Sequence, residues 1–110
     1  MQQPINDFIK PSETCYTVYS KSGCPNCKKV KDLLDFSKIP FKTIDCDDYL
    51  VESKSEFLSF IMNLTSQDWK SFPIVFNNVG DFIGGFIDTR EYLEKNQEKK
   101  EQSLDFTDDF

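Results

Sequence analysis

Two cysteines separated by two residues stand in the segment KSGCPNC, residues 21–27. A thiol pair at this spacing can form a redox-active disulfide, supply half of a metal site, or act as a structural staple. Lys21 lies three residues before Cys24, and Pro25 stands between the two cysteines. A metal pair rarely needs an intervening proline, and a staple rarely needs a lysine, so the pattern favours redox chemistry.

A helix that starts at Pro25 would place Cys24 beside unpaired backbone N–H groups and the positive end of the helix dipole. Both features favour a thiolate, and Lys21 adds a cation if it folds back over the loop. Such surroundings lower a cysteine pKa from ~8.5 to about 3.5–7.5. Cys27, one turn into the helix, is expected to be more buried and less acidic. The spacing therefore predicts that Cys24 attacks a disulfide and Cys27 resolves the intermediate.

A metal site is the main structural alternative for the cysteine pair. Zinc would need two more ligands, and the chain has no histidine and only Cys15 and Cys46 as further cysteines. No second C-x-x-C is present, so no metal is expected. Cys15 and Cys46 are expected to be small buried or half-buried packing residues.

The elements that must position the pair follow from local patterns. Four segments rich in β-branched and aromatic residues are predicted strands, and they are 15–19, 41–45, 74–76 and 82–84. Helices are predicted from Pro25, after Ser53, and from Asp88 to about 93–98. The order is β-α-β-α-β-β-α, with the last two strands joined as a hairpin.

Length and composition bound the remaining possibilities. A chain of 110 residues with 38% hydrophobic residues and eleven phenylalanines predicts one globular domain with an aromatic core. A net charge of −6 without a basic cluster argues against nucleic-acid binding. No segment is long and apolar enough to span a membrane, and no signal peptide is recognisable, so a cytoplasmic location is expected. We divide the chain into a polar lead-in (1–14), a domain (15–98) and an acidic tail (99–110).

Two longer blocks carry a family resemblance. TVYSKSGCPNCKKVKDLL resembles the strand, active-site loop and first helix of the dithiol CPxC glutaredoxins, and SFPIVFNNVGDFIGGFIDT resembles their second block. The resemblance covers residues 15–95. It implies an α/β, thioredoxin-like fold, with a four-stranded mixed sheet and three main helices on both faces. It also implies glutathione-dependent reduction of protein disulfides and glutathionyl mixed disulfides, with glutathione as co-substrate.

The resemblance implies a role for each matching residue. Cys24 would be the nucleophile and Cys27 the resolving thiol. The implied glutathione-binding residues are Lys21, Lys70, Phe72, Pro73, Gly85, Ile87 and Asp88. The two lysines would meet a glutathione carboxylate, a cis Pro73 would face the cysteines, and the backbone of Phe72 would pair with the cysteinyl unit. Gly85 would allow close approach, and the Ile87 N–H with Asp88 would hold the γ-glutamyl end.

The sequence departs from the family pattern at several of these positions. Asn26 replaces a more usual tyrosine, Phe72 a smaller valine-like residue, and Ile87 an acidic or hydroxyl side chain. Each residue also has a structural interpretation, since Asp88 alone could simply cap a helix and Lys21 alone could be a solvated charge. Their joint order favours the functional interpretation.

Two further questions stay open at the level of sequence. The chain could be reduced by thioredoxin reductase instead of glutathione, or the fold could hold an iron–sulfur cluster or a protein partner. The expected partners are glutathione and disulfide-bearing or glutathionylated proteins, with a monomer as the expected state. The end of the tail, SLDFTDDF, resembles the tail by which the small subunit of ribonucleotide reductase docks on the large subunit. A disordered solubilising tail is the favoured interpretation of that segment.

Overall fold

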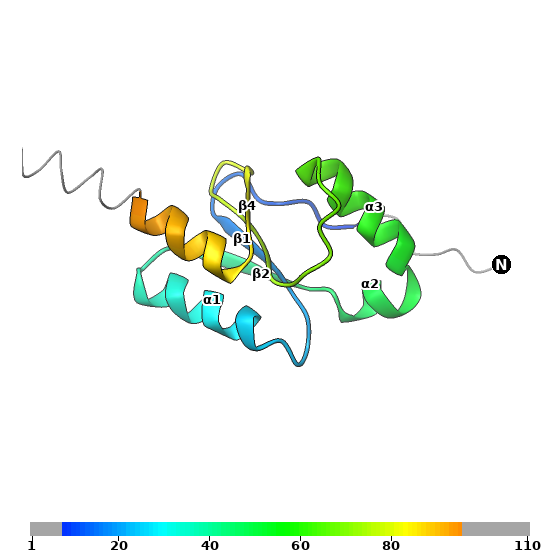
Figure 1. Ribbon diagram of the computed structural model, residues 1–110, viewed down its shortest axis with the longest axis horizontal. Coiled ribbons are helices and arrows are strands. Elements are labelled where there is room, and N and C mark those ends of the chain that lie inside the picture. The colour runs from blue at the N-terminus through cyan, green and yellow to red at the C-terminus, as the bar shows by residue number, and fades with distance from the viewer. Residues whose placement is uncertain (1–7, 96–110) are drawn as a thin grey trace, which may run out of the picture.

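The computed structural model describes residues 8–95, which form a four-stranded sheet with helices on both faces (Figure 1). The strand order is β2-β1-β3-β4. The central strand β1 (Tyr16–Ser20) pairs in parallel with β2 (Phe41–Asp45) and antiparallel with β3 (Ile74–Phe76). β3 pairs antiparallel with the edge strand β4 (Phe82–Gly84). The sheet is therefore mixed, as predicted.

The helices supply the connections and cover the sheet. α1 (Pro25–Phe36) joins the parallel strands β1 and β2, as a crossover between parallel neighbours requires. Two helices, the short α2 (Asp47–Glu52) and α3 (Lys54–Thr65), lie between β2 and β3. A last helix begins at residue 86 and continues to residue 95, where the described part ends. Figure 1 shows α1 and this last helix on one side of the sheet and α2 with α3 on the other.

The core consists of two hydrophobic clusters, one on each face of the sheet. Alternation along β1 separates them, because Val18 faces α1 and the last helix whereas Tyr19 faces α3. The α1 face contains Tyr16, Val18, Val30, Leu34, Val75 and Leu93. The α3 face is richer in aromatic side chains, including Tyr19, Phe57 and Phe76. Since both faces of β1 are buried, its position is fixed from both sides, and the loop that follows it starts from a rigid base.

Several elements differ from the sequence-based expectation. β1 begins one residue later than predicted, and α2 was not predicted at all. Its six residues are too few to show an amphipathic pattern, and Tyr49 and Leu50 are only half-buried against the core. Phe8, from the polar lead-in, is buried against Tyr49, Phe57 and Phe60. The last helix starts two residues before Asp88, because Asp88 lies in its first turn and is not its N-cap.

Within residues 8–95 no helix has the length and apolar content needed to cross a membrane. The acidic tail, with its resemblance to a ribonucleotide reductase tail, and residues 1–7 lie outside the described residues.

Candidate active site

The cysteine pair lies where β1 ends and α1 begins. Pro25 is the first residue of α1, a position where the missing N–H of proline costs no helical hydrogen bond. Cys24 is the N-cap residue, with an extended backbone at φ −115° and ψ 99°. Cys24 and Cys27 form a disulfide, with their Cα atoms 5.2 Å apart. The helix start therefore presents both sulfurs at one end of the central strand.

The surroundings of the two sulfurs differ in the sense that their predicted roles require. The backbone N–H of Cys27 donates to the Cys24 Sγ over 3.1 Å, so the sulfur is the cap of the helix. Cys24 is half-buried, whereas Cys27 is only 2% exposed. A reduced Cys24 at this position would hold negative charge against an N–H donor and the helix dipole. An incoming disulfide would reach Cys24 before Cys27.

The loop before Cys24 is anchored to α2. The carboxylate of Asp47 accepts hydrogen bonds from the backbone N–H of Ser22, over 2.9 Å, and from the Ser22 hydroxyl. These two bonds, together with the charge of Lys21, lower the pKa of Asp47 below its ordinary value. The Lys21 ammonium lies 5.6 Å from the centroid of the Phe72 ring, within cation–π range. Lys21 thus points toward the segment that precedes β3.

That segment lies beside the start of the last helix. The Phe72–Pro73 peptide is cis and Pro73 is fully buried. Gly84, at φ +136°, adopts a backbone conformation that favours glycine, and a Cβ there would collide with the carboxyl group of Asp88. Asp88 accepts the N–H of Gly85 over 3.1 Å, and Gly85 lies beside the Pro73 carbonyl. An N3 carboxylate that reaches back to the N-cap N–H is half of a capping box.

A shallow pocket of ≈ 220 Å³ lies beside this loop, and we call it the lysine pocket. Its lining residues are Lys21, Leu50, Lys54, Leu58, Lys70 and Phe72. Lys70 forms an exposed ion pair with Asp68 at 3.6 Å, whereas Lys21 and Lys54 form no ion pair within residues 8–95. Three cations around an apolar floor make this pocket suited to an anionic group, although the whole chain is acidic at −6.

The predicted glutathione-binding residues fall into two groups. Lys21, Lys70 and Phe72 line the lysine pocket, while Gly85 and Asp88 meet at the start of the last helix. Ile87 is 48% exposed.

Lys54, the third cation of the lysine pocket, was not among the predicted site residues. It lies one turn before Leu58 on α3, and both residues line the pocket. A spacing of four residues places the two side chains on one helix face, but it does not indicate that this face meets Lys21 and Lys70.

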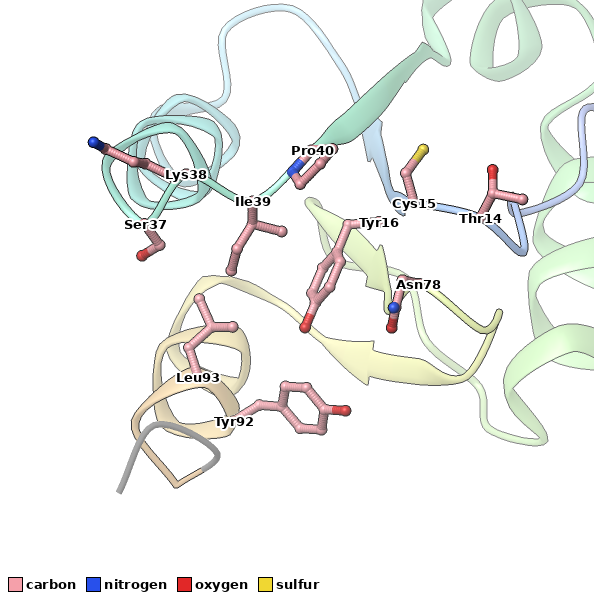
Figure 2. Close-up of a pocket in the computed structure, with 10 residues that line it drawn as sticks. All are labelled: Thr14, Cys15, Tyr16, Ser37, Lys38, Ile39, Pro40, Asn78, Tyr92 and Leu93. Carbon is pink, nitrogen blue, oxygen red and sulfur yellow. The ribbon is translucent and has the colours of Figure 1, made fainter. Parts of the chain in front are cut away.

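The other two cysteines lie apart from this chemistry. Cys46 is fully buried, its thiol donates to the Ile44 carbonyl over 3.5 Å, and burial raises its pKa to about 12. Cys15 is half-buried and lines a pocket of ≈ 630 Å³ between the start of β1, the end of α1 and the last helix (Figure 2). That pocket is at the opposite end of β1 and α1 from Cys24. Both thiols fit the packing role that the sequence suggested.

A four-stranded mixed sheet with this strand order and helices on both faces is a thioredoxin-like fold. The family model described as Glutaredoxin matches residues 16–83. The chain therefore belongs to the glutaredoxin family, whose members are oxidoreductases. The fold and the family predicted from the sequence are thus confirmed.

Individual relatives agree with this assignment. Mitochondrial glutaredoxin-2 of Rattus norvegicus is 31% identical over 87 residues, which are 78% of this chain and 52% of that protein. The chain thus spans about half the length of the mitochondrial relatives it matches. A wheat glutaredoxin structure is 34% identical with a TM-score of 0.61, covering 78% of this chain and 75% of that one. A buckwheat glutaredoxin–glutathione complex is 29% identical with a TM-score of 0.59, covering 74% and 69%.

Proposed function

We propose that this protein is a glutathione-dependent thiol–disulfide oxidoreductase that reduces glutathionyl mixed disulfides and protein disulfides. The observation that supports this most directly is the position of the Cys24 sulfur at the N-cap of α1, where it accepts the Cys27 N–H. A thiolate is the nucleophile in disulfide exchange, and this position stabilises a thiolate. The partner thiol, Cys27, is already within bonding reach.

Reduction of a glutathionyl mixed disulfide needs only Cys24. Its thiolate attacks the glutathione sulfur, a new S–S bond joins Cys24 to glutathione, and the target protein leaves as a thiolate that takes a proton from solvent. The thiolate of a second glutathione then attacks the glutathione sulfur on Cys24. This step releases oxidised glutathione and restores the Cys24 thiolate.

Reduction of a protein disulfide needs both cysteines. Cys24 attacks one sulfur of the target, which creates a mixed disulfide between the two proteins and releases one target thiolate. The Cys27 thiolate then attacks the Cys24 sulfur, so that the second target thiolate leaves and the Cys24–Cys27 disulfide closes. The structure contains this bond. Two glutathione molecules reopen it and become oxidised glutathione.

Glutathione is a tripeptide with a carboxylate at each end, and the chain offers polar groups in the lysine pocket and at the start of the last helix. In the proposed complex the glycyl carboxylate lies in the lysine pocket, near Lys21, Lys54 and Lys70. The γ-glutamyl end lies at the start of the last helix, near Asp88 and the Ile87 N–H. The buckwheat glutaredoxin complex with glutathione supports this choice of ligand.

The test is the reduction of a glutathionylated peptide by glutathione and glutathione reductase, with wild type, Cys24→Ser and Cys27→Ser. We expect Cys24→Ser to lose at least about 10³-fold in turnover, because the attacking thiolate is gone. Cys27→Ser should retain deglutathionylation but lose the reduction of protein disulfides. Equal losses in both variants would contradict the assigned roles. Turnover with thioredoxin reductase and none with glutathione would contradict the proposed reductant.

A further inference from the structure

The contact between Asp47 and Ser22 is a feature of the site that the cysteine chemistry does not use. One carboxylate oxygen accepts the Ser22 backbone N–H at 2.9 Å and the other accepts the Ser22 hydroxyl, across 25 residues of sequence. Within residues 8–95, these are the hydrogen bonds that join residues 21–23 to another element. Next along the loop, Gly23 has φ +66°, and a Cβ there would meet only open space. Packing therefore does little to hold this loop in place, and Asp47 holds it.

The same contact joins two walls of the lysine pocket. Lys21 lies beside Ser22 in the loop, and Leu50 follows Asp47 by one turn of α2. Both Lys21 and Leu50 line the pocket. A displacement of the loop relative to α2 would therefore change the distance between the Lys21 cation and the opposite wall.

The charges around Asp47 keep the contact intact at neutral pH. Its two bonds from Ser22 and the positive charge of Lys21 lower its pKa, so the group is a carboxylate with two acceptor oxygens. Its own backbone N–H donates to the side chain of Asp45 over 3.0 Å, which fixes the start of α2. Hydrogen bonds to an ionised acceptor are stronger than neutral ones.

We propose that Asp47 is a positioning residue for glutathione: it fixes Ser22, and through Ser22 the Lys21 ammonium, against α2. The inference rests on the proposed function, in which Lys21 meets the glycyl carboxylate of glutathione. Asp47 itself does not touch the substrate. Its removal should therefore weaken glutathione binding more than it slows the chemical step at Cys24.

The chain offers a matched control for this test. Asp48 is also acidic and also lies in the first turn of α2, but no hydrogen bond joins its side chain to another described residue. Asp47→Ala and Asp48→Ala thus remove the same charge from the same helix end, and only the first breaks the contact. We expect Asp47→Ala to raise KM for glutathione roughly three- to tenfold with kcat within about twofold, and Asp48→Ala to change neither.

Three more variants separate the contact from general loosening of α2. Ser22→Ala removes the hydroxyl bond but keeps the backbone N–H, so its KM should rise less than that of Asp47→Ala. Because both residues act through one contact, the double variant should be no worse than Asp47→Ala alone. Asp47→Asn keeps one oxygen for the Ser22 N–H and should recover part of the lost affinity. Circular dichroism and urea unfolding confirm that each variant is folded under assay conditions.

The outcomes distinguish this inference from the proposed function. A wild type that does not turn over glutathione contradicts the proposed function itself. An active wild type in which Asp47→Ala and Asp48→Ala behave alike overturns the positioning role alone. Additive losses from Ser22→Ala and Asp47→Ala would also overturn it, because they would show that the two residues act separately.

Discussion

Cys24 and Cys46 both occupy N-cap positions, yet they present opposite chemistry. The Cys24 sulfur is half-buried and accepts the N–H of Cys27 at the start of α1. The Cys46 sulfur precedes α2, is fully buried, makes no capping hydrogen bond and donates its proton to the Ile44 carbonyl. An accepted N–H favours the thiolate, whereas a donated S–H favours the thiol. Burial is the larger difference between the two sites, since it raises the pKa of Cys46 even though a backbone hydrogen bond at Ser20 acts in the opposite sense.

Neighbouring charges widen the same difference. The loop before Cys24 contains Lys21, while Cys46 stands between Asp45 and Asp47, whose charges add to burial in raising the Cys46 pKa to about 12. A helix start is therefore insufficient for a reactive cysteine. The sulfur must also be open to solvent, receive an N–H, and lie away from carboxylates.

The largest effect should appear in alkylation of the fully reduced protein. At pH 7 we expect iodoacetamide to label Cys24 at least about 10³-fold faster than Cys46, because labelling requires an accessible thiolate. Mass spectrometry of the separate peptides over time gives both rates. In concentrated urea the two rates should converge, which serves as the control. Comparable labelling of both residues in the folded protein would show that Cys24 and Cys46 do not differ in reactivity as proposed.

Replacing the buried thiol tests its structural role. Cys46→Ser places a more polar group in a fully buried site, and we expect a loss of about 1–3 kcal/mol in the free energy of unfolding. Turnover should stay within about twofold of wild type, since Cys46 takes no part in exchange. Cys15→Ser, at a half-buried position, is the control and should cost less. Urea unfolding supplies the measurement, and a large loss of turnover in folded Cys46→Ser would contradict a purely structural role.

The raised pKa of Cys46 also predicts a pH dependence of stability. The unfolded thiol ionises near 8.5 and the folded thiol near 12, so the stability contributed by the protonated thiol is complete below pH 8.5. It is lost as pH rises between these values, by up to about 1.4 kcal/mol per pH unit. The two proteins to compare both carry Cys15→Ser and the Cys24–Cys27 disulfide. The one that keeps Cys46 should lose stability from pH 8 to 10 faster than the one with Cys46→Ala. Parallel losses in the two proteins would contradict the shift.

The local parts of this fold could be predicted from the sequence. The strand 41–45, the start of α1 at Pro25 and the 74–84 hairpin all match, since each depends on β-branched residues, a proline or a turn that lies within a few positions. α2 was missed because it has only six residues, and the two that pack against the core, Tyr49 and Leu50, are adjacent and half-buried, so no helical periodicity is visible. Phe8 was missed because a single buried residue in a polar segment gives no pattern.

The same distinction between local patterns and long-range contacts applies to the residues of the candidate site. Cys24 and Cys27 could be identified because their chemistry is encoded in four consecutive residues. Lys54 and Asp47 could not, because each acquires its position only when α2, α3 and the loop come together. A contact across 25 residues leaves no local spacing to detect.

The smallest effects should separate two of the three cations of the lysine pocket. Lys21 lies in the loop that leads to Cys24, whereas Lys54 lies on α3, and both line the lysine pocket. Lys21→Gln should therefore raise KM for glutathione and also move the onset of Cys24 alkylation to higher pH. Lys54→Gln should raise KM by roughly two- to fivefold and leave the alkylation profile unchanged. Lys42→Gln, an exposed charge on β2, is the control for net charge.

The glycyl ethyl ester of glutathione tests whether the two lysines act through the glycyl carboxylate, because the ester lacks that carboxylate. Wild type should bind the ester more weakly than glutathione, and Lys54→Gln should then lose little further affinity, since its partner is already absent. The alkylation shift of Lys21→Gln should persist, because it depends on the field at Cys24 and not on the ligand. An equal penalty for Lys54→Gln with both ligands would mean that this lysine acts through something other than the carboxylate. The cation that tunes the sulfur and the cation that only binds the ligand can thus be told apart by one chemical change in the substrate.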